Sequence, residues 1–207
     1  MISFVFFDVG GVVIKDFSGT NKWYELKRKI GISDDQMQDV DVHWKKYKDP
    51  IDNGDIDLTV IENMLREEFH IPIPKNYSML DDFVDHFEKN PSIWPIIREI
   101  HKTHRIGLLT NMYVGMFEKI VKRDLLPPEI WDTIIDSSII HMKKPDKKIY
   151  ELAQKQAGVP ANEIFFVDNL ERNITPASEL GWQTFFYDSK KPENSSQQLM
   201  EIFLQKK

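Results

Sequence analysis

Apolar positions along the chain follow two alternating patterns. Short, nearly continuous apolar runs, which are typical of strands buried on both faces of a parallel sheet, occur at residues 2–7, 106–109, 133–135, 164–167 and 184–187. Between them lie segments with helical spacing, such as 147–156, where Ile149, Leu152 and Ala153 share one face. Alternating strands and helices with short turns predict parallel pairing through right-handed crossovers. We therefore expect an α/β fold with a doubly wound, Rossmann-like parallel sheet.

The alternation is interrupted between residues 16 and 90. This block contains no convincing strand, and helices are expected at residues 21–30, 33–46, 58–69 and 79–87. Pro50, Asn53 and Gly54 predict a turn between the second and third of these helices. We therefore predict two domains. Residues 1–15 and 91–207 form the α/β core, and residues 16–90 form a small helical cap domain inserted into it.

Polar residues follow three of the expected strands. Asp8 ends the first apolar run, Thr110 and Asn111 end the second, and Asp168 ends the fourth, while Lys144 precedes a helix. Because parallel strands place their carboxyl ends at one edge of a sheet, these side chains should converge. Taken singly, each has an ordinary structural explanation, such as a strand-end cap, a helix cap or a solvated lysine.

Taken together, these polar residues predict a site for a metal ion and a phosphate group. Two neighbouring carboxylates, Asp8 and Asp168, repel each other unless a cation lies between them, and oxygen ligands suit Mg²⁺. The Thr110 hydroxyl, backbone amides and Lys144 supply donors for phosphate oxygens.

Composition narrows the range of partners. The chain has 207 residues, a net charge of -6 and a pI near 5.5, which argues against a nucleic-acid or anionic-membrane surface. No apolar stretch reaches the roughly 18 residues that span a bilayer, and no basic segment precedes an apolar run, so no signal peptide is expected. The absence of cysteine excludes disulfides, thiolate metal sites and a cysteine nucleophile. We expect a cytoplasmic protein that acts on a small molecule, and the oligomeric state stays open.

Four segments together resemble the motifs of a known family. Residues 6–13 (FFDVGGVV) resemble the first motif of the haloacid dehalogenase-like hydrolases, and residues 108–111 (LLTN) resemble the second. Residues 144–150 (KPDKKIY) are similar to the third motif. Residues 165–169 (FFVDN), followed by 179–181 (ELG), are similar to the fourth. The likeness covers the whole chain, because this family inserts a helical cap just after the first strand. It is closest to the branch of sugar-phosphate phosphatases such as glucose-1-phosphatase.

The resemblance implies a mechanism with named residues. Asp8 is the implied nucleophile, which attacks phosphorus and forms an aspartyl-phosphate. The implied ligands of Mg²⁺ are Asp8, Asp168 and the backbone carbonyl of Gly10. Thr110 and the Asn111 amide would bind the phosphoryl oxygens, and Lys144 would neutralise both the nucleophile and the phosphate. The implied activity is a Mg²⁺-dependent phosphatase of small phosphomonoesters.

The chain departs from the family pattern at two positions. Most phosphatases of the family have a second Asp two residues after the nucleophile, where it serves as general acid and base, but this chain has Gly10. Asn173 stands where a second acidic residue often follows Asp168, so a more weakly held metal is expected. Without an acid at position 10, the enzyme should prefer good leaving groups, such as those of sugar 1-phosphates or acyl phosphates. A rival source of the proton is Asp16, which could equally be a solvated turn residue.

Two alternatives to the phosphatase follow from these departures. One is a protein of the same fold that binds phosphorylated ligands with little turnover, because its acid and base are lost at Gly10. The other is a 2-haloacid dehalogenase. That branch also lacks the second Asp but uses an aromatic residue there and needs no metal, so Gly10 and the lysine-rich third motif favour the phosphatase.

Overall fold

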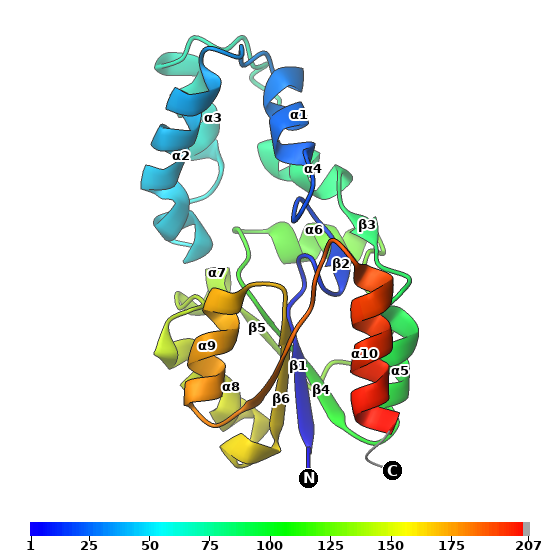
Figure 1. The fold of residues 1–207 in the computed structure, drawn as a ribbon. Coiled ribbons are helices and arrows are strands. Elements are labelled where there is room, and N and C mark those ends of the chain that lie inside the picture. Colours follow the sequence, from blue (N-terminus) through cyan, green and yellow to red (C-terminus); the bar gives the residue numbers. More distant parts are fainter. Residues whose placement is uncertain (205–207) are drawn as a thin grey trace.

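A five-stranded, all-parallel sheet forms the centre of the molecule (Figure 1). The computed structural model describes residues 1–204, so the last three residues of the predicted core domain lie outside it. The strand order is β5-β4-β1-β6-β7. The strands are β1 (Phe4–Phe7), β4 (Arg105–Thr110), β5 (Thr133–Asp136), β6 (Ile164–Asp168) and β7 (Gln183–Phe186). The predicted doubly wound α/β fold is confirmed, because helices cover both faces of the sheet.

Alternate residues of each strand face opposite sides, which explains the unbroken apolar runs. Phe4 and Phe6 pack with helices α8 (Lys147–Ala157) and α9 (Glu171–Glu179). Val5 and Phe7 belong to the cluster on the other face, which includes α5 (Trp94–His101) and α10 (Pro192–Leu204). Figure 1 shows these two helix pairs on either side of the sheet. None of the helices in the described part of the chain is long and apolar enough to cross a bilayer.

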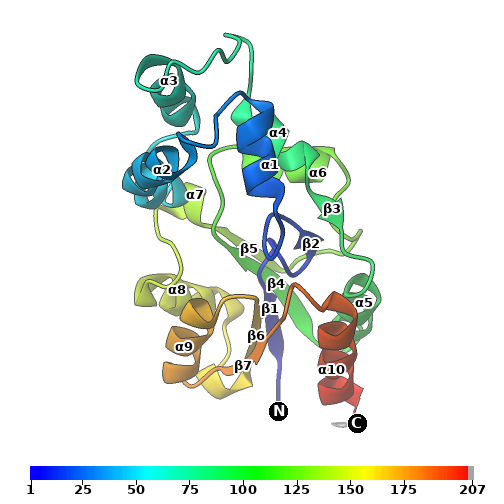
Figure 2. The same cartoon turned by 45° about the horizontal axis from the view of Figure 1, so that its top comes forward.

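Four further helices stand beyond the carboxyl ends of the strands (Figure 2). They are α1 (Lys22–Lys29), α2 (Met37–Asp52), α3 (Thr59–Glu67) and α4 (Met79–Asp85). Aromatic side chains join three of them, α1, α2 and α4, since the ring centroids of Trp23 and Trp44 lie 4.8 Å apart and those of Trp23 and Phe83 lie 5.6 Å apart. We call these four helices the helical layer.

A short antiparallel ribbon connects the helical layer to the sheet. Its strands are β2 (Ile14–Lys15) and β3 (Glu88–Lys89), with Ile14 opposite Lys89. The expectation of no strand between residues 16 and 90 is therefore wrong at β3. Two exposed charged residues carry no strand pattern, so only the pairing with β2 identifies this strand.

Several expected helix boundaries are also wrong. A helix was expected over residues 33–46, but α2 begins at Met37 and continues through Pro50. It begins late because the Ser33 hydroxyl donates to the Gln36 side chain instead of capping the helix. The sequence after the second expected strand predicts a helix over residues 112–123, but helix α6 (Met116–Lys122) begins only after Gly115, whose φ of 75° does not continue a helix. The polar residues 188–196 predict a loop and residues 197–204 a helix, but helix α10 already begins at Pro192. The short helix α7 (Ser137–Ile140) was not predicted.

Candidate active site

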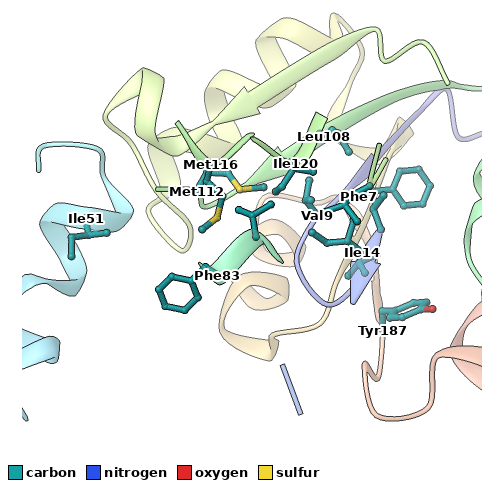
Figure 3. Packing of buried hydrophobic residues seen from close by; sticks show 14 of the residues in the cluster. Phe7, Val9, Ile14, Ile51, Phe83, Leu108, Met112, Met116, Ile120 and Tyr187 are labelled. Carbon is teal, nitrogen blue, oxygen red and sulfur yellow. The ribbon is translucent and has the colours of Figure 1, made fainter. Parts of the chain in front are cut away.

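A cavity of ≈ 220 Å³ lies between the strand ends and the helical layer. Asp8, Gly10 and Lys144 line it from the sheet, and Lys48 and Asp52 line it from α2. One side wall is apolar: Figure 3 shows Ile14, Phe83, Met112, Met116 and Ile120 in the cluster beside the end of β1. The cavity therefore combines charged groups at the sheet edge with an apolar side wall.

Three charged side chains meet at the sheet edge, where Asp8 and Lys144 line the cavity and Asp168 lies against Lys144. Phe7 pairs with Val167, so the register of β1 and β6 places Asp8 and Asp168 side by side. The Lys144 Nζ lies 3.0 Å from Asp8 Oδ1 and 2.6 Å from Asp168 Oδ2. Asp8, Lys144 and Asp168 are only 7%, 2% and 0% exposed. We call these three residues the charged triad, and its net formal charge is negative.

Burial and mutual attraction oppose each other within the charged triad. Burial raises the pKa of the Asp8 carboxyl, and the adjacent Lys144 ammonium limits that rise. For Lys144, burial acts to lower the pKa, but the charges of Asp168 and Asp8 outweigh it and raise the pKa above its usual value. Lys144 therefore stays protonated at neutral pH and faces the cavity as a buried cation.

Asn111 holds Lys144 in position. Its side-chain Nδ2 donates to the Lys144 carbonyl oxygen at 2.9 Å, and its Oδ1 accepts from the Lys144 N–H at 2.8 Å. The Asn111 side chain is thus committed to the backbone of the lysine loop. The sequence predicted an Asn111 contact with phosphate, and the backbone N–H and the second hydrogen of Nδ2 are the donors left for that contact.

Thr110, the last residue of β4, offers an unused polar group. Its Oγ1 is buried and has no hydrogen-bond partner among residues 1–204. Leaving a buried hydroxyl unpaired costs about 1–3 kcal/mol. Because Phe7 pairs with Leu108, Thr110 ends the strand next to Asp8. An oxyanion bound beside Asp8 would satisfy this hydroxyl.

Asp168 is engaged more completely than the sequence suggested. Its Oδ1 accepts from the Leu170 N–H at 2.8 Å and from Asn173 Nδ2 at 3.1 Å. Its Oδ2 accepts from Lys144 at 2.6 Å and from the same Asn173 group at 3.1 Å. Asp168 would have to exchange one of these bonds to ligate a metal. In this arrangement it orients Lys144.

The remaining oxygen donors determine whether a metal fits. Asp8 Oδ1 accepts from the Val9 N–H and contacts Lys144, which leaves Oδ2 to the cavity. Gly10 also lines the cavity, and the buried Asn173 Oδ1 lacks a partner within the described chain. One carboxylate with neutral carbonyl oxygens suits a single Mg²⁺ that keeps several waters. No cluster of three or more His, Cys, Asp or Glu side chains that could hold a metal occurs in residues 1–204. These residues therefore fit a weakly held ion.

Asp16 carries a weak sequence signal, but the structure places it at the site. It lines the same cavity as Asp8 and is partly buried. Burial raises the pKa of its carboxyl, and the hydrogen bond from the Ser18 N–H opposes the rise. The interpretation of Asp16 as a solvated turn residue does not hold. Lys48 and Arg172, which also line the cavity, were not predicted because single charged residues in helices carry no distinguishing signal.

Most of the chain matches the sequence model of one known protein family. A family model described as haloacid dehalogenase-like hydrolase matches residues 2–181. Bifunctional epoxide hydrolase 2 of Sus scrofa is 26% identical over 125 residues, which are 57% of this chain and 22% of that protein. The chain therefore spans only about a fifth of this curated relative.

Solved structures share the fold. A HAD family enzyme from Bacteroides thetaiotaomicron, in complex with magnesium and inorganic phosphate, superposes with a TM-score of 0.74 at 19% identity, covering 91% of this chain and 95% of that one. An L-2-haloacid dehalogenase gives a TM-score of 0.64 at 18% identity, covering 90% and 84%. Since phosphate-binding enzymes and dehalogenases both share the architecture, the fold alone does not select the reaction.

Proposed function

Because the chain belongs to the haloacid dehalogenase-like hydrolases, we propose that it is a phosphatase that hydrolyses small phosphomonoesters through an aspartyl-phosphate on Asp8. One observation carries the proposal: a buried lysine cation contacts a carboxylate with a free oxygen at a cavity, and the neighbouring strand β4 ends in an unpaired buried hydroxyl. A nucleophile, a cation and a hydroxyl donor are the groups that phosphoryl transfer requires.

Each polar residue at the sheet edge has a proposed task. Asp8 Oδ2 attacks phosphorus, and the bond from phosphorus to the leaving oxygen breaks. Lys144 reduces the repulsion between the anionic nucleophile and the anionic ester, and Thr110 Oγ1 donates to a phosphoryl oxygen. Asp168 and Asn111 keep Lys144 in position. Water then cleaves the aspartyl-phosphate, which releases phosphate and regenerates Asp8.

Magnesium dependence is part of the proposal. Mg²⁺ bound by Asp8 and the Gly10 carbonyl, with Asp168 joining if it exchanges a hydrogen bond, would supply positive charge opposite the phosphate. The Bacteroides thetaiotaomicron enzyme of the same fold was crystallised with magnesium and inorganic phosphate, which supports this assignment. With one freely available carboxylate, we expect an affinity low enough for dialysis to remove the metal.

We also propose that residues 16–90 act as a cap domain that selects the leaving group. Lys48 and Asp52 face the cavity from α2, and Phe83 faces it from α4. The cavity volume of ≈ 220 Å³ is below the roughly 300–1,000 Å³ of drug-sized pockets. A small polar ester fits these walls, and sugar 1-phosphates are the first candidates.

The proposal is tested by following phosphate and halide release in parallel. The purified protein is incubated with a chromogenic phosphomonoester, with and without Mg²⁺, and separately with 2-haloacids. We expect metal-dependent phosphate release and a mass increase of one phosphoryl group on Asp8 after acid quenching. Halide release without phosphatase activity would make the protein a dehalogenase. Saturable phosphate binding without turnover would make it a binding protein.

A further inference from the structure

We propose that Asp16 is the general acid and base of this site, in place of a side chain at position 10. It would protonate the leaving oxygen during attack by Asp8 and then deprotonate the water that cleaves the aspartyl-phosphate. The inference rests on the proposed phosphatase function and names a catalytic residue for it.

The geometry around Gly10 carries this inference. A Cβ added to Gly10 would lie 2.6 Å from Asp16 Oδ2, 3.4 Å from its Cγ and 3.9 Å from its Cβ. The Asp16 carboxylate therefore occupies the space in which a side chain at position 10 would begin. The neighbouring Gly11 has a φ of 74°, which favours glycine, but Gly10 lies outside the left-handed region. A side chain at position 10 would therefore have to displace the Asp16 carboxylate, whereas the backbone conformation there would permit it.

The ribbon between the sheet and the helical layer fixes Asp16 in this place. Asp16 directly follows β2, whose Lys15 pairs with Glu88 of β3. Its Oδ1 accepts from the Ser18 N–H at 2.8 Å. Within residues 1–204 the hydrogen-bond donors to this carboxyl group are those of Ser18 and the Asp16 backbone N–H, all of them neutral and local. A carboxyl group that no cation binds is suited to exchange a proton with a ligand.

The other two acidic groups of the cavity, Asp52 and Asp8, are less suited to this role. Asp52 Oδ2 accepts a 2.6 Å hydrogen bond from Lys48, and Asp52 belongs to the helical layer. Asp8 is the nucleophile in the proposed reaction, so it is not available to protonate the leaving group. Asp16, in contrast, has no cationic hydrogen-bond partner. It lies beside Gly10, in the turn that directly follows the nucleophile Asp8.

Over the two steps of the reaction, Asp16 gives up one proton and takes one back. In the first step Asp8 forms a bond to phosphorus, the ester P–O bond breaks, and the leaving oxygen takes the proton of the Asp16 carboxyl. In the second step a water oxygen attacks phosphorus and gives a proton to the Asp16 carboxylate. The bond between phosphorus and Asp8 then breaks, which releases phosphate and restores both groups.

The experiment compares Asp16→Asn with the wild type on aryl and alkyl phosphates in the presence of Mg²⁺. An aryl leaving group departs without protonation, so Asp16→Asn should release about one equivalent of aryl alcohol in a burst and then accumulate phosphorylated Asp8. An alkyl ester needs the acid, so we expect its kcat to fall by about 10²–10⁴-fold. The exposed carboxylate Asp35 supplies the matched control Asp35→Asn, which should turn over both esters normally.

A second variant keeps the inference falsifiable if Asp16→Asn folds poorly. Gly10→Asp alone should be damaging, because its Cβ meets the Asp16 carboxylate. Combined with Asp16→Ser, which vacates that space, Gly10→Asp should regain activity on alkyl esters relative to Asp16→Ser alone. Wild-type alkyl turnover by Asp16→Asn, or no gain in the double variant, would overturn the role of Asp16 while Asp8→Asn still abolishes turnover. Absence of phosphatase activity in the wild type would instead refute the proposed function and this inference with it.

Discussion

The two sides of the cavity are built on different principles. On the sheet side, the charged triad is buried and oriented by other residues: Asn111 holds the backbone of Lys144, and Asn173 donates to both oxygens of Asp168. On the side of the helical layer, one partner of each charged pair is open to solvent. The Lys48 side chain is 39% exposed and pairs with the buried Asp52, and the Asp49 side chain is 81% exposed and pairs with Lys143.

This difference indicates that the sheet side positions the reacting groups and the helical layer selects the ester. Groups fixed by packing and by further hydrogen bonds hold a reacting atom to within a fraction of an ångström, which chemistry requires. Solvent-exposed pairs contribute only about 0–1 kcal/mol each and tolerate change. We therefore expect substitutions on the sheet side to act on reaction rate, and substitutions in the helical layer to act on the choice of ester.

Asp8→Asn tests the sheet side most severely. The amide is nearly the same size, so we expect the fold to persist, but it is a poor nucleophile. Turnover should fall by on the order of 10⁴–10⁶-fold, as when other enzymes lose a nucleophile. Phosphate release measures the loss, and circular dichroism verifies folding. Activity above a few per cent of wild type would exclude the covalent role of Asp8.

Lys144→Ala should affect both rate and stability. It leaves Asp8 and Asp168 buried without their shared cation, and breaking a buried ion pair from one side costs about 3–5 kcal/mol. We expect a lower free energy of unfolding in urea, a higher KM and a lower kcat. The adjacent Lys143→Ala removes only an exposed pair with Asp49 and is the matched control. A silent Lys144→Ala beside a damaging Lys143→Ala would show that the wrong lysine was assigned.

The same contrast explains what the sequence could predict. The apolar runs of the sheet and the residues at the strand ends follow from local patterns, because parallel strands align their carboxyl ends. The hydrogen bonds of Asn111 and Asn173 depend on loops that meet only in the folded chain. The closeness of Gly10 and Asp16 likewise depends on the ribbon, whose strand β3 has no sequence signal. In the helical layer, propensity misplaced both ends of α2, since packing carries that helix past Pro50.

Asn111→Ala is expected to have an intermediate effect. It removes two hydrogen bonds to the Lys144 backbone, which together contribute about 1–3 kcal/mol. Without them the lysine loop loses its fixed position, so kcat should fall while the Asp8 nucleophile is unchanged. Asn111→Asp keeps the acceptor for the Lys144 N–H and should retain more activity than Asn111→Ala. Equal kinetics for Asn111→Ala and the wild type would show that the loop is held by other contacts.

Lys48→Ala should have the smallest effect and bears most directly on the helical layer. The pair with Asp52 is partly open to solvent at the lysine, so we expect the free energy of unfolding to change by no more than about 1 kcal/mol. Aryl phosphates, whose leaving groups need little recognition, should be turned over with nearly unchanged kcat. In a bound sugar phosphate, the sugar would lie against the cavity wall that Lys48 lines. We therefore expect Lys48→Ala to change the ratio of the kcat/KM values for different sugar phosphates. A panel of sugar phosphates, assayed by phosphate release for Lys48→Ala and the wild type, measures this ratio. If all esters lose the same factor, the helical layer affects chemistry and not selection, and the proposed division between the two sides is wrong.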